Sequence, residues 1–192
     1  MPKVRVNDIT MNYEQQGTGE PLVLIPYLAA DNACYAFQVA DYAKQFTCIS
    51  IDPRGAGETD KPAGNYSTEL FADDVAAFMQ AIGVERAHIS GLSLGAATGL
   101  WLAAKHPQRV KSLSLHSAWT KSDPFLNAVV EGWQTMAKGL GDVTEMIIGA
   151  SSLGVLRLNC TPPSRNTSAS LQHSCADGRS SPLMPSSGNR MR

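Results

Sequence analysis

The chain has 192 residues, of which 43% are hydrophobic, and its formal net charge is −1 at pH 7. This length is enough for one hydrophobic core and too short for two full domains. The near-zero charge gives no reason to expect nucleic acid or an anionic membrane as a partner. No apolar run approaches the roughly 18 residues of a membrane-spanning helix. We therefore expect a globular protein that binds neither nucleic acid nor membrane.

The N-terminus and the four cysteines bear on the compartment. Residues 1–5 turn polar at once and lack the apolar segment of a secretion signal. The cysteines show neither a CxxC pair nor any metal-ligand spacing. Cys34 and Cys48 lie in apolar surroundings, which favours buried thiols over a disulfide between them. The sequence thus predicts a cytoplasmic protein with neither a metal site nor a cofactor.

The first part of the chain predicts short strands around one helix. In chain order, we expect a hairpin at 3–6 and 9–14, a strand at 21–26, a helix at 35–44, a strand at 46–51 and a polar loop at 52–59. The hairpin is predicted because its two arms alternate apolar and polar residues around Asn7-Asp8. The next two strands are continuous apolar runs, which are typical of strands buried on both faces.

The middle of the chain continues the alternation of helices and strands. We expect a helix from 68 to about 82, a strand at 87–92, a helix ending at 106–107 and a strand at 110–116. Ser67 is a suitable N-cap for the first of these helices, and Gly83 a suitable terminator. Strands that alternate with helices indicate an α/β fold, a mostly parallel sheet with helices on both faces.

One stretch, residues 87–97, combines a short apolar run, the pattern Gly91-Leu92-Ser93-Leu94-Gly95 and a helix-forming run. This is the sequence form of a nucleophile elbow, a tight strand-to-helix turn that exposes a serine hydroxyl. Gly91 and Gly95 are small enough to let strand and helix pass closely. The helix N-terminus favours developing negative charge beside Ser93. Ser93 is therefore the candidate nucleophile.

Several motifs in register resemble the α/β-hydrolase fold family. They are the N-terminal hairpin, the strand 22–25, the loop Asp52-Pro53-Arg54-Gly55-Ala56-Gly57, the elbow, and the segment 106–110 that closes its helix. The resemblance covers roughly residues 3 to 120. Within the family, the chain resembles small esterases, enol-lactonases, carbon–carbon bond hydrolases and cofactor-free haloperoxidases. Epoxide hydrolases and haloalkane dehalogenases carry aspartate where this chain has Ser93, which argues against those two activities.

The resemblance implies acyl transfer. Ser93 would attack a carbonyl carbon, and backbone N–H groups would hold the resulting oxyanion. One donor would be the N–H of Leu94, and the other would come from the loop around Leu28. That loop departs from the family, because Pro26-Tyr27 stands where relatives usually have His-Gly. The Tyr27 phenol is an alternative donor, although a tyrosine beside a pocket is more often part of its wall.

Five other polar residues lie near the predicted motifs. Asp52 and Arg54 are expected to fix their own loop rather than to touch substrate. His88 lies inside a predicted strand and is expected to be structural. His106 ends a helix, where a partial positive charge is favourable. His116 ends a strand near the expected site, but it precedes the position at which the family carries its histidine.

The remainder of the chain changes character. Residues 121–150 are predicted to begin a cap region, because apolar residues between Phe125 and Leu140 recur at helical spacing. Residues 151–192 are rich in Ser, Pro and Arg and lack Lys, Phe, Tyr, Trp and Ile, a composition that suits disorder. The family order is Ser, then an acid, then His. His173 and Asp177 are the only later pair, and they stand in the reverse order.

A frameshift is our hypothesis for this serine-rich segment. Most serine codons begin with TC, so reading one base upstream places T in the middle of the codon and specifies Phe, Leu, Ile or Val. With synonymous codons chosen freely, residues 150–168 can spell an apolar, cap-like sequence. On this reading the chain holds only the N-terminal part of the fold, without its last strands and without the acid and histidine.

Two functional classes follow. The first is a serine hydrolase that acts on an ester, lactone or related small-molecule carbonyl through Ser93, with weak or absent activity in this chain. The second is a non-catalytic binding or interaction protein that keeps the fold. A phosphate-binding protein is a distant third, because Gly55-Ala56-Gly57 lacks the remaining residues of a nucleotide fingerprint. An incomplete sheet would also leave an edge through which the chain could self-associate.

Overall fold

A computed structural model describes residues 2–140 of the chain. The chain divides into two compact units, Met1–Thr135 and Met136–Arg192, and the fold below belongs to the first. The predicted serine-rich segment, with His173 and Asp177, lies outside the described residues, as does the end of the predicted cap region. None of the described helices has both the length and the apolar character that a membrane span requires.

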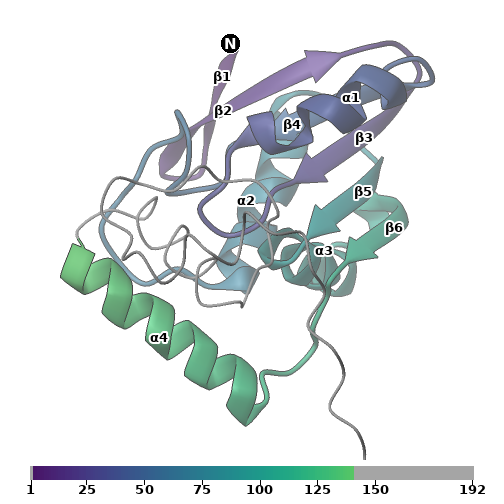
Figure 1. Cartoon of the computed structure of the whole chain (residues 1–192). Coiled ribbons are helices and arrows are strands. Elements are labelled where there is room, and N and C mark those ends of the chain that lie inside the picture. Colours follow the sequence, from purple (N-terminus) through teal and green to yellow (C-terminus); the bar gives the residue numbers. More distant parts are fainter. Residues whose placement is uncertain (1, 141–192) are drawn as a thin grey trace, which may run out of the picture. The chain divides into compact units, whose positions relative to one another are not determined.

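The described part of the chain alternates strands and helices (Figure 1). The elements are β1 (Lys3–Val6), β2 (Ile9–Gln16), β3 (Glu20–Ile25), a 3-10 turn (Asn32–Tyr35), α1 (Ala36–Tyr42), β4 (Phe46–Ile51), α2 (Thr68–Ala81), β5 (Ala87–Leu92), α3 (Leu94–Lys105), a second 3-10 turn (Pro107–Arg109), β6 (Val110–His116) and α4 (Pro124–Leu140). This order confirms the predicted succession of elements.

The six strands form one sheet in the order β1-β2-β4-β3-β5-β6. Strands β4, β3, β5 and β6 are parallel, whereas the β1–β2 hairpin joins β4 in antiparallel fashion. A mostly parallel sheet with helices on both faces was predicted and is confirmed. The carboxyl ends of parallel strands lie at one edge of such a sheet, which is where α/β folds place their ligands.

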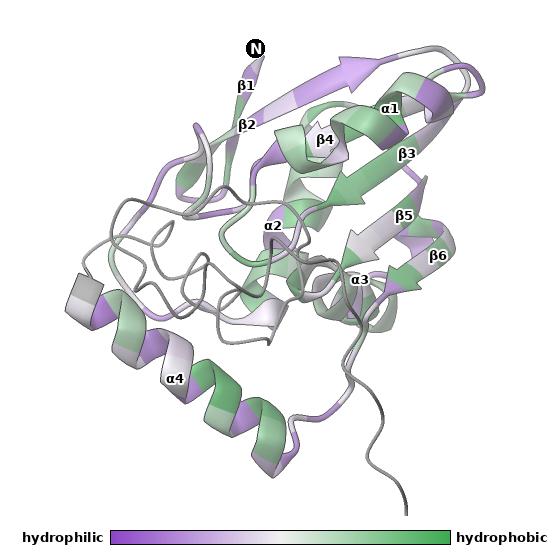
Figure 2. Cartoon of the chain, in the orientation of Figure 1, coloured by the Kyte–Doolittle hydropathy of each residue, from purple (hydrophilic) through white to green (hydrophobic). Residues whose placement is uncertain are grey.

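Strand β3 is buried on both faces, as its unbroken apolar run predicts. Leu22 and Leu24 pack with Tyr35 and Val39, on the side of α1. Their neighbours Val23 and Ile25 belong to the larger core cluster on the other side. That cluster is completed by side chains of α2 and α3, among them Phe78, Met79 and Leu102. Figure 2 shows the hydrophobic colouring of β3 between its two layers.

Two elements differ in length from the prediction. Strand β2 extends to Gln16 rather than residue 14, because its last two residues pair with Ile49 and Cys48 of β4. The helix predicted over 35–44 is shorter and begins as a 3-10 turn, in which the Asp31 side chain accepts a hydrogen bond from the Ala33 amide. Cross-strand pairing and local capping, which periodicity does not report, set both limits.

The predicted helix ends are confirmed for α2. The Ser67 hydroxyl accepts a hydrogen bond from the Leu70 amide at 3.1 Å, and Gly83 follows the helix with φ at 75°. The helix α4 accounts for the helical pattern predicted after residue 121. Its first turn is capped by Asp123, which accepts a bond from Leu126 at 2.7 Å. Hydrophobic and hydrophilic residues alternate along α4 in Figure 2.

Candidate active site around Ser93

Ser93 is the single residue between β5 and α3, and its backbone is strained. Its φ is 54° and its ψ is −112°, values that a residue with a Cβ rarely adopts. A non-glycine residue held in such a region costs of order 1–3 kcal/mol. The amide of Ser93 donates to the carbonyl of His116 at 2.9 Å, which continues the pairing of β5 with β6 up to the turn. The predicted strand–turn–helix context of the motif is therefore present.

The two glycines of the motif lie where a side chain would collide with backbone. A Cβ on Gly91 would overlap the carbonyl of Gly95 in the first turn of α3. A Cβ on Gly95 would overlap the carbonyl of Ile25 at the end of β3. The sequence Gly-x-Ser-x-Gly therefore lets β5, α3 and the end of β3 meet in one place.

The first amides of α3 lie directly beside Ser93. Leu94 is the first residue of this helix, and an amide in the first turn has no acceptor within its own helix. It is thus available to an anion at the helix N-terminus, where the helix dipole adds to the attraction.

The loop after β3 supplies the second predicted donor. Its residues 27–30 form a turn closed by the Ala30 amide, which donates to the carbonyl of Tyr27 at 3.1 Å. This bond does not use the amide of Leu28, a central residue of the turn. Ala29 takes a φ of 62°, a left-handed conformation usually given to glycine. The left-handed conformation thus falls on Ala29, directly after the exposed residues Tyr27 and Leu28.

This loop is held at both ends by buried hydrogen bonds. The Tyr35 hydroxyl donates to the carbonyl of Ile25 at 3.0 Å, at the start of the loop. At its far end, the Asp52 carboxylate accepts bonds from the amide and the side chain of Asn32, at 2.8 and 2.7 Å. The other oxygen of Asp52 accepts from Asn12 and from the amide of Glu58. Asp52 thus fixes its own loop, as expected, and also the loop around Leu28, for which the sequence carried no local signal.

Arg54 is the buried centre of an ion cluster. Its guanidinium donates to Asp74 of α2 at 2.7 Å and also to Asp8 in the β1–β2 turn. Hydrogen bonding to Arg54 lowers the pKa of Asp8 to about 2. The two carboxylates in turn raise the pKa of Arg54. Arg54 was expected to fix its loop, and it joins that loop to the hairpin and to α2. Asp74 is itself buried, and its carboxylate accepts two hydrogen bonds from this guanidinium.

The three described histidines each have a polar partner away from the Ser93 hydroxyl. His88 contacts Glu20 and Ser112, each at 2.7 Å. His106 contacts Asp73 of α2 at 3.0 Å. The His116 Nε2 atom lies 3.2 Å from the Ser114 hydroxyl oxygen, and the His116 carbonyl accepts a hydrogen bond from the Ser93 amide. Within residues 2–140, no hydrogen bond links the Ser93 hydroxyl to a histidine.

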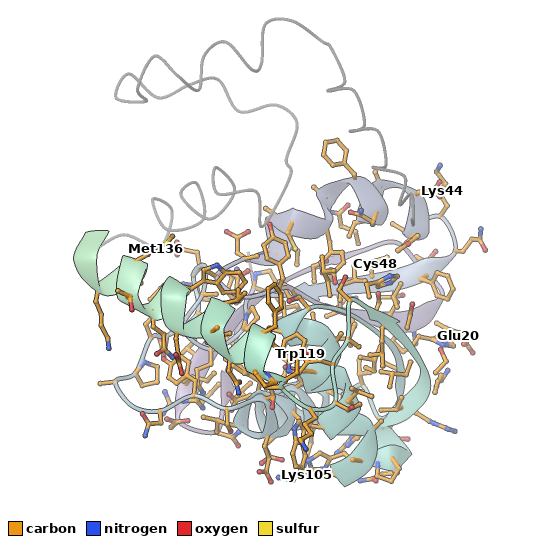
Figure 3. All side chains as sticks on the ribbon, turned by 60° about the horizontal axis from the view of Figure 1, so that its bottom comes forward. Glu20, Lys44, Cys48, Lys105, Trp119 and Met136 are labelled. Atoms are coloured by element: carbon orange, nitrogen blue, oxygen red, sulfur yellow. The ribbon has the colours of Figure 1, made fainter. Side chains whose placement is uncertain are left out.

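Both described cysteines are free thiols. Cys48 is buried in β4 (Figure 3), and burial raises its pKa. Cys34 is half-buried, and burial with the nearby carboxylates Asp31 and Asp52 raises its pKa to about 11. The expected absence of a bond between them agrees with these states. A raised pKa disfavours the thiolate, which is the nucleophilic form of cysteine.

Comparison with known proteins identifies the family. Residues 20–151 match the family model described as the alpha/beta hydrolase fold. The chain is 31% identical over 131 residues to a putative carbamate hydrolase, RutD, of Azorhizobium caulinodans, with 68% of this chain and 49% of the relative covered. It is 33% identical over 117 residues to a fluoroacetate dehalogenase of a Burkholderia species, with 58% of this chain and 38% of the relative covered.

The solved structures agree with this family. The enol-lactonase of Burkholderia xenovorans LB400 superposes with a TM-score of 0.57 at 34% identity, covering 58% of this chain and 45% of that one. The chain therefore belongs to the α/β-hydrolase fold family. It spans about half the length, or less, of the curated relatives named here.

Proposed function

We propose that Ser93 is the nucleophile of an acyl-transfer site that acts on an ester, a lactone or a related small-molecule carbonyl compound. The observation that carries the proposal is the strained backbone of Ser93 between β5 and α3. Such strain persists only where the surroundings impose it, and it clusters at functional sites. Here the two flanking glycines allow the close contact that imposes it. The likeness to an enol-lactonase supports a carbonyl substrate.

The oxyanion formed by this attack would be held by two amides. The Leu94 amide belongs to the first turn of α3, beside the nucleophile. The amide of Leu28 belongs to the turn after β3, and the start of that segment, at Ile25 and Pro26, lies against Gly95 of α3, which supports this role. Two such donors stabilise a tetrahedral intermediate by several kcal/mol, since removal of one typically costs about 2.7–4 kcal/mol.

We expect this chain to be acylated by reactive probes more readily than it turns over an ester. Serine is a weak nucleophile unless a base accepts its proton. Within the described residues, the Ser93 hydroxyl has no histidine as a hydrogen-bond partner. Loss of the base leaves only the residual catalysis of the oxyanion site, which is roughly 10³–10⁴-fold over water in serine proteases. We therefore propose that turnover by this chain is impaired unless a residue outside 2–140 supplies the base.

The alternative function is a non-catalytic one, in which the family fold binds a carbonyl compound or another partner without turnover. What favours this alternative is that, within the described part of the chain, no histidine forms a hydrogen bond with the Ser93 hydroxyl. The two functions differ in whether the Ser93 hydroxyl reacts at all.

The deciding experiment is labelling of the purified chain with a fluorophosphonate, followed by mapping of the adduct to a peptide. We expect an adduct on Ser93 that Ser93→Ala abolishes and Ser114→Ala retains, because Ser114 is an exposed serine of β6 remote from the elbow in sequence. Hydrolysis of a short p-nitrophenyl ester by the same three proteins measures turnover. A folded chain without an adduct on Ser93 would favour the binding function and contradict the proposed nucleophile.

We further propose self-association through β6, the last strand of the described sheet. Within residues 2–140 its outer edge pairs with no further strand, and such an edge is a template for another strand. The free thiols of Cys34 and Cys48 support a cytoplasmic location, since reducing compartments keep thiols unpaired.

A further inference from the structure

A second serine lies in a hydrogen-bonded relay with a histidine and a carboxylate. The His88 Nδ1 atom lies 2.7 Å from the Ser112 hydroxyl oxygen, and its Nε2 atom lies 2.7 Å from a carboxylate oxygen of Glu20. The other oxygen of Glu20 binds Lys111 at 3.1 Å. The Phe46 ring packs edge-on against the imidazole, with ring centroids 5.7 Å apart. The imidazole is therefore held in one orientation by neighbours on three strands.

This relay stands at the end of the sheet opposite the elbow. Its members occupy the amino-terminal parts of β3, β5 and β6, and the register aligns Leu22, His88 and Ser112 on adjacent strands. His88 precedes Ser93 by five residues along β5, which is roughly 16 Å in an extended strand. Glu20 projects at the surface in Figure 3, and its side chain is 61% exposed. The relay is thus open to small molecules and separate from Ser93.

The carboxylate dictates where the proton of the imidazole resides. The bonds to His88 and Lys111 lower the pKa of Glu20, which keeps this side chain ionised at neutral pH. An ionised carboxylate only accepts hydrogen bonds, so the Nε2 atom of His88 must carry the hydrogen. In the neutral ring, Nδ1 then holds the free lone pair and accepts the hydroxyl proton of Ser112. This is the arrangement by which a serine is activated for attack.

We propose that Ser112 is a second, independent nucleophile that takes an acyl group from activated small-molecule esters. The Ser112 hydroxyl oxygen forms a bond to the carbonyl carbon while its proton passes to Nδ1 of His88. The carbonyl then reforms, the bond to the leaving alkoxide or phenoxide breaks, and this group takes the proton from Nδ1. The products are acyl-Ser112, the free alcohol or phenol and neutral His88. Glu20 acts as a positioning residue, because it holds the imidazole through Nε2.

The reaction is expected to stop at the acyl-enzyme. Ser112 lies inside β6 and does not precede a helix, so it lacks the helix N-terminus that Leu94 provides for Ser93. Without that stabilisation of the oxyanion, hydrolysis of the adduct is slow. One acyl group per chain should therefore accumulate instead of continuous turnover.

The test uses the full-length chain carrying Ser93→Ala, treated with p-nitrophenyl acetate at pH 8 and analysed by intact mass and peptide mapping. We expect one acetyl group on Ser112. Adding Ser112→Ala should abolish this adduct, and adding His88→Gln should slow its formation at least tenfold. Ser114→Ala is the matched control, because Ser114 is an exposed serine on the same strand that also contacts a histidine. It should leave the adduct on Ser112 unchanged.

A second pair of variants tests the part assigned to Glu20. Glu20→Gln should slow the acetylation of Ser112 in the parent chain and should slow it no further in the His88→Gln variant, because Glu20 acts only through the imidazole. A role in stability alone would shift thermal unfolding and leave the rate of acetylation unchanged. The proposal is overturned if Ser112 carries no acetyl group, or if His88→Gln acquires it at the same rate while its thermal unfolding matches that of the parent. Because peptide mapping gives the residue that carries the acetyl group, and Ser93 is replaced by alanine, this result is independent of whether Ser93 is the nucleophile of the proposed function.

Discussion

At the scale of single residues, the turn at Ser93 depends on two positions that have no side chain, Gly91 and Gly95. The strained turn at Ser93 is possible because Gly91 and Gly95 carry no side chains, which would collide with neighbouring backbone. The same closeness brings the carbonyls of Ile25 and Pro26, at the end of β3, against Gly95 in the first turn of α3. The conformation of the proposed nucleophile and the close approach of β3 to α3 thus depend on the same small residues.

Gly95→Ala is expected to destabilise the fold by roughly 1–3 kcal/mol or more, the usual cost of overpacking. Its new Cβ would overlap the carbonyls of Ile25 and Pro26, which belong to backbone and cannot rotate away. The matched control is Gly132→Ala in α4, where a Cβ meets open space. There the same change should be neutral or should favour the helix by about 1 kcal/mol. Urea unfolding measures both, and equal free energies of unfolding for the two variants would contradict the steric argument.

At the scale of elements, ion pairs to the buried Arg54 side chain join segments that hydrophobic packing alone would leave loosely oriented. Arg54 follows β4 and binds both the β1–β2 turn, through Asp8, and α2, through Asp74. A carboxylate and a guanidinium are costly to bury unless each finds its partner in good geometry. The cluster therefore contributes more to the orientation of α2 over the sheet than to stability as such.

The Asp8 contact predicts a specific pH dependence of unfolding. The pKa of Asp8 is about 2 in the folded chain, below its usual value of about 3.9. The stabilisation is therefore complete above about pH 4 and is lost as the pH falls towards 2. The difference in free energy of unfolding between the native chain and Asp8→Asn should shrink over this range.

The matched control for this measurement is Asp41→Asn, which removes an exposed pair with Lys44, a residue of the turn that follows α1. Exposed ion pairs contribute little to stability. A difference for Asp8→Asn that stays constant from pH 5 to pH 2 would contradict the role given to Arg54. High salt should weaken the effect, since Asp8 is largely exposed.

At the scale of the whole molecule, local patterns predicted the elements better than the contacts between them. The strands, the α2 caps and the elbow follow from periodicity, Ser67, Gly83 and the two motif glycines. The relay of Glu20, His88 and Ser112 does not, because its members are 68 and 24 residues apart and meet only through the register of three strands. The second anchor of the Leu28 loop, Asn32 on Asp52, was missed for the same reason.

Self-association belongs to this scale as well. If β6 pairs with a second copy, Ser114→Lys should shift the chain towards the monomer, because a lysine on an edge strand opposes pairing. Ser114→Ala is the control that changes the same exposed position without a charge. Sedimentation velocity at several concentrations measures the shift. A native chain that is monomeric throughout, or a lysine variant that associates equally well, would contradict pairing through β6.

The two-sided burial of β3 has a consequence for how the chain folds. A strand with one apolar face is held in register by that face, since a slip of one residue would turn it towards water. In β3 both faces are apolar, so a slipped pairing would bury nearly as much hydrocarbon as the native one. The native register is therefore distinguished from a slipped one by contacts at the two ends of the strand. At one end Glu20 bonds to His88. At the other, the Ile25 carbonyl accepts a bond from Tyr35 and lies against Gly95. Formation of the contacts at both ends of β3 is therefore also what rejects misaligned pairings of this strand.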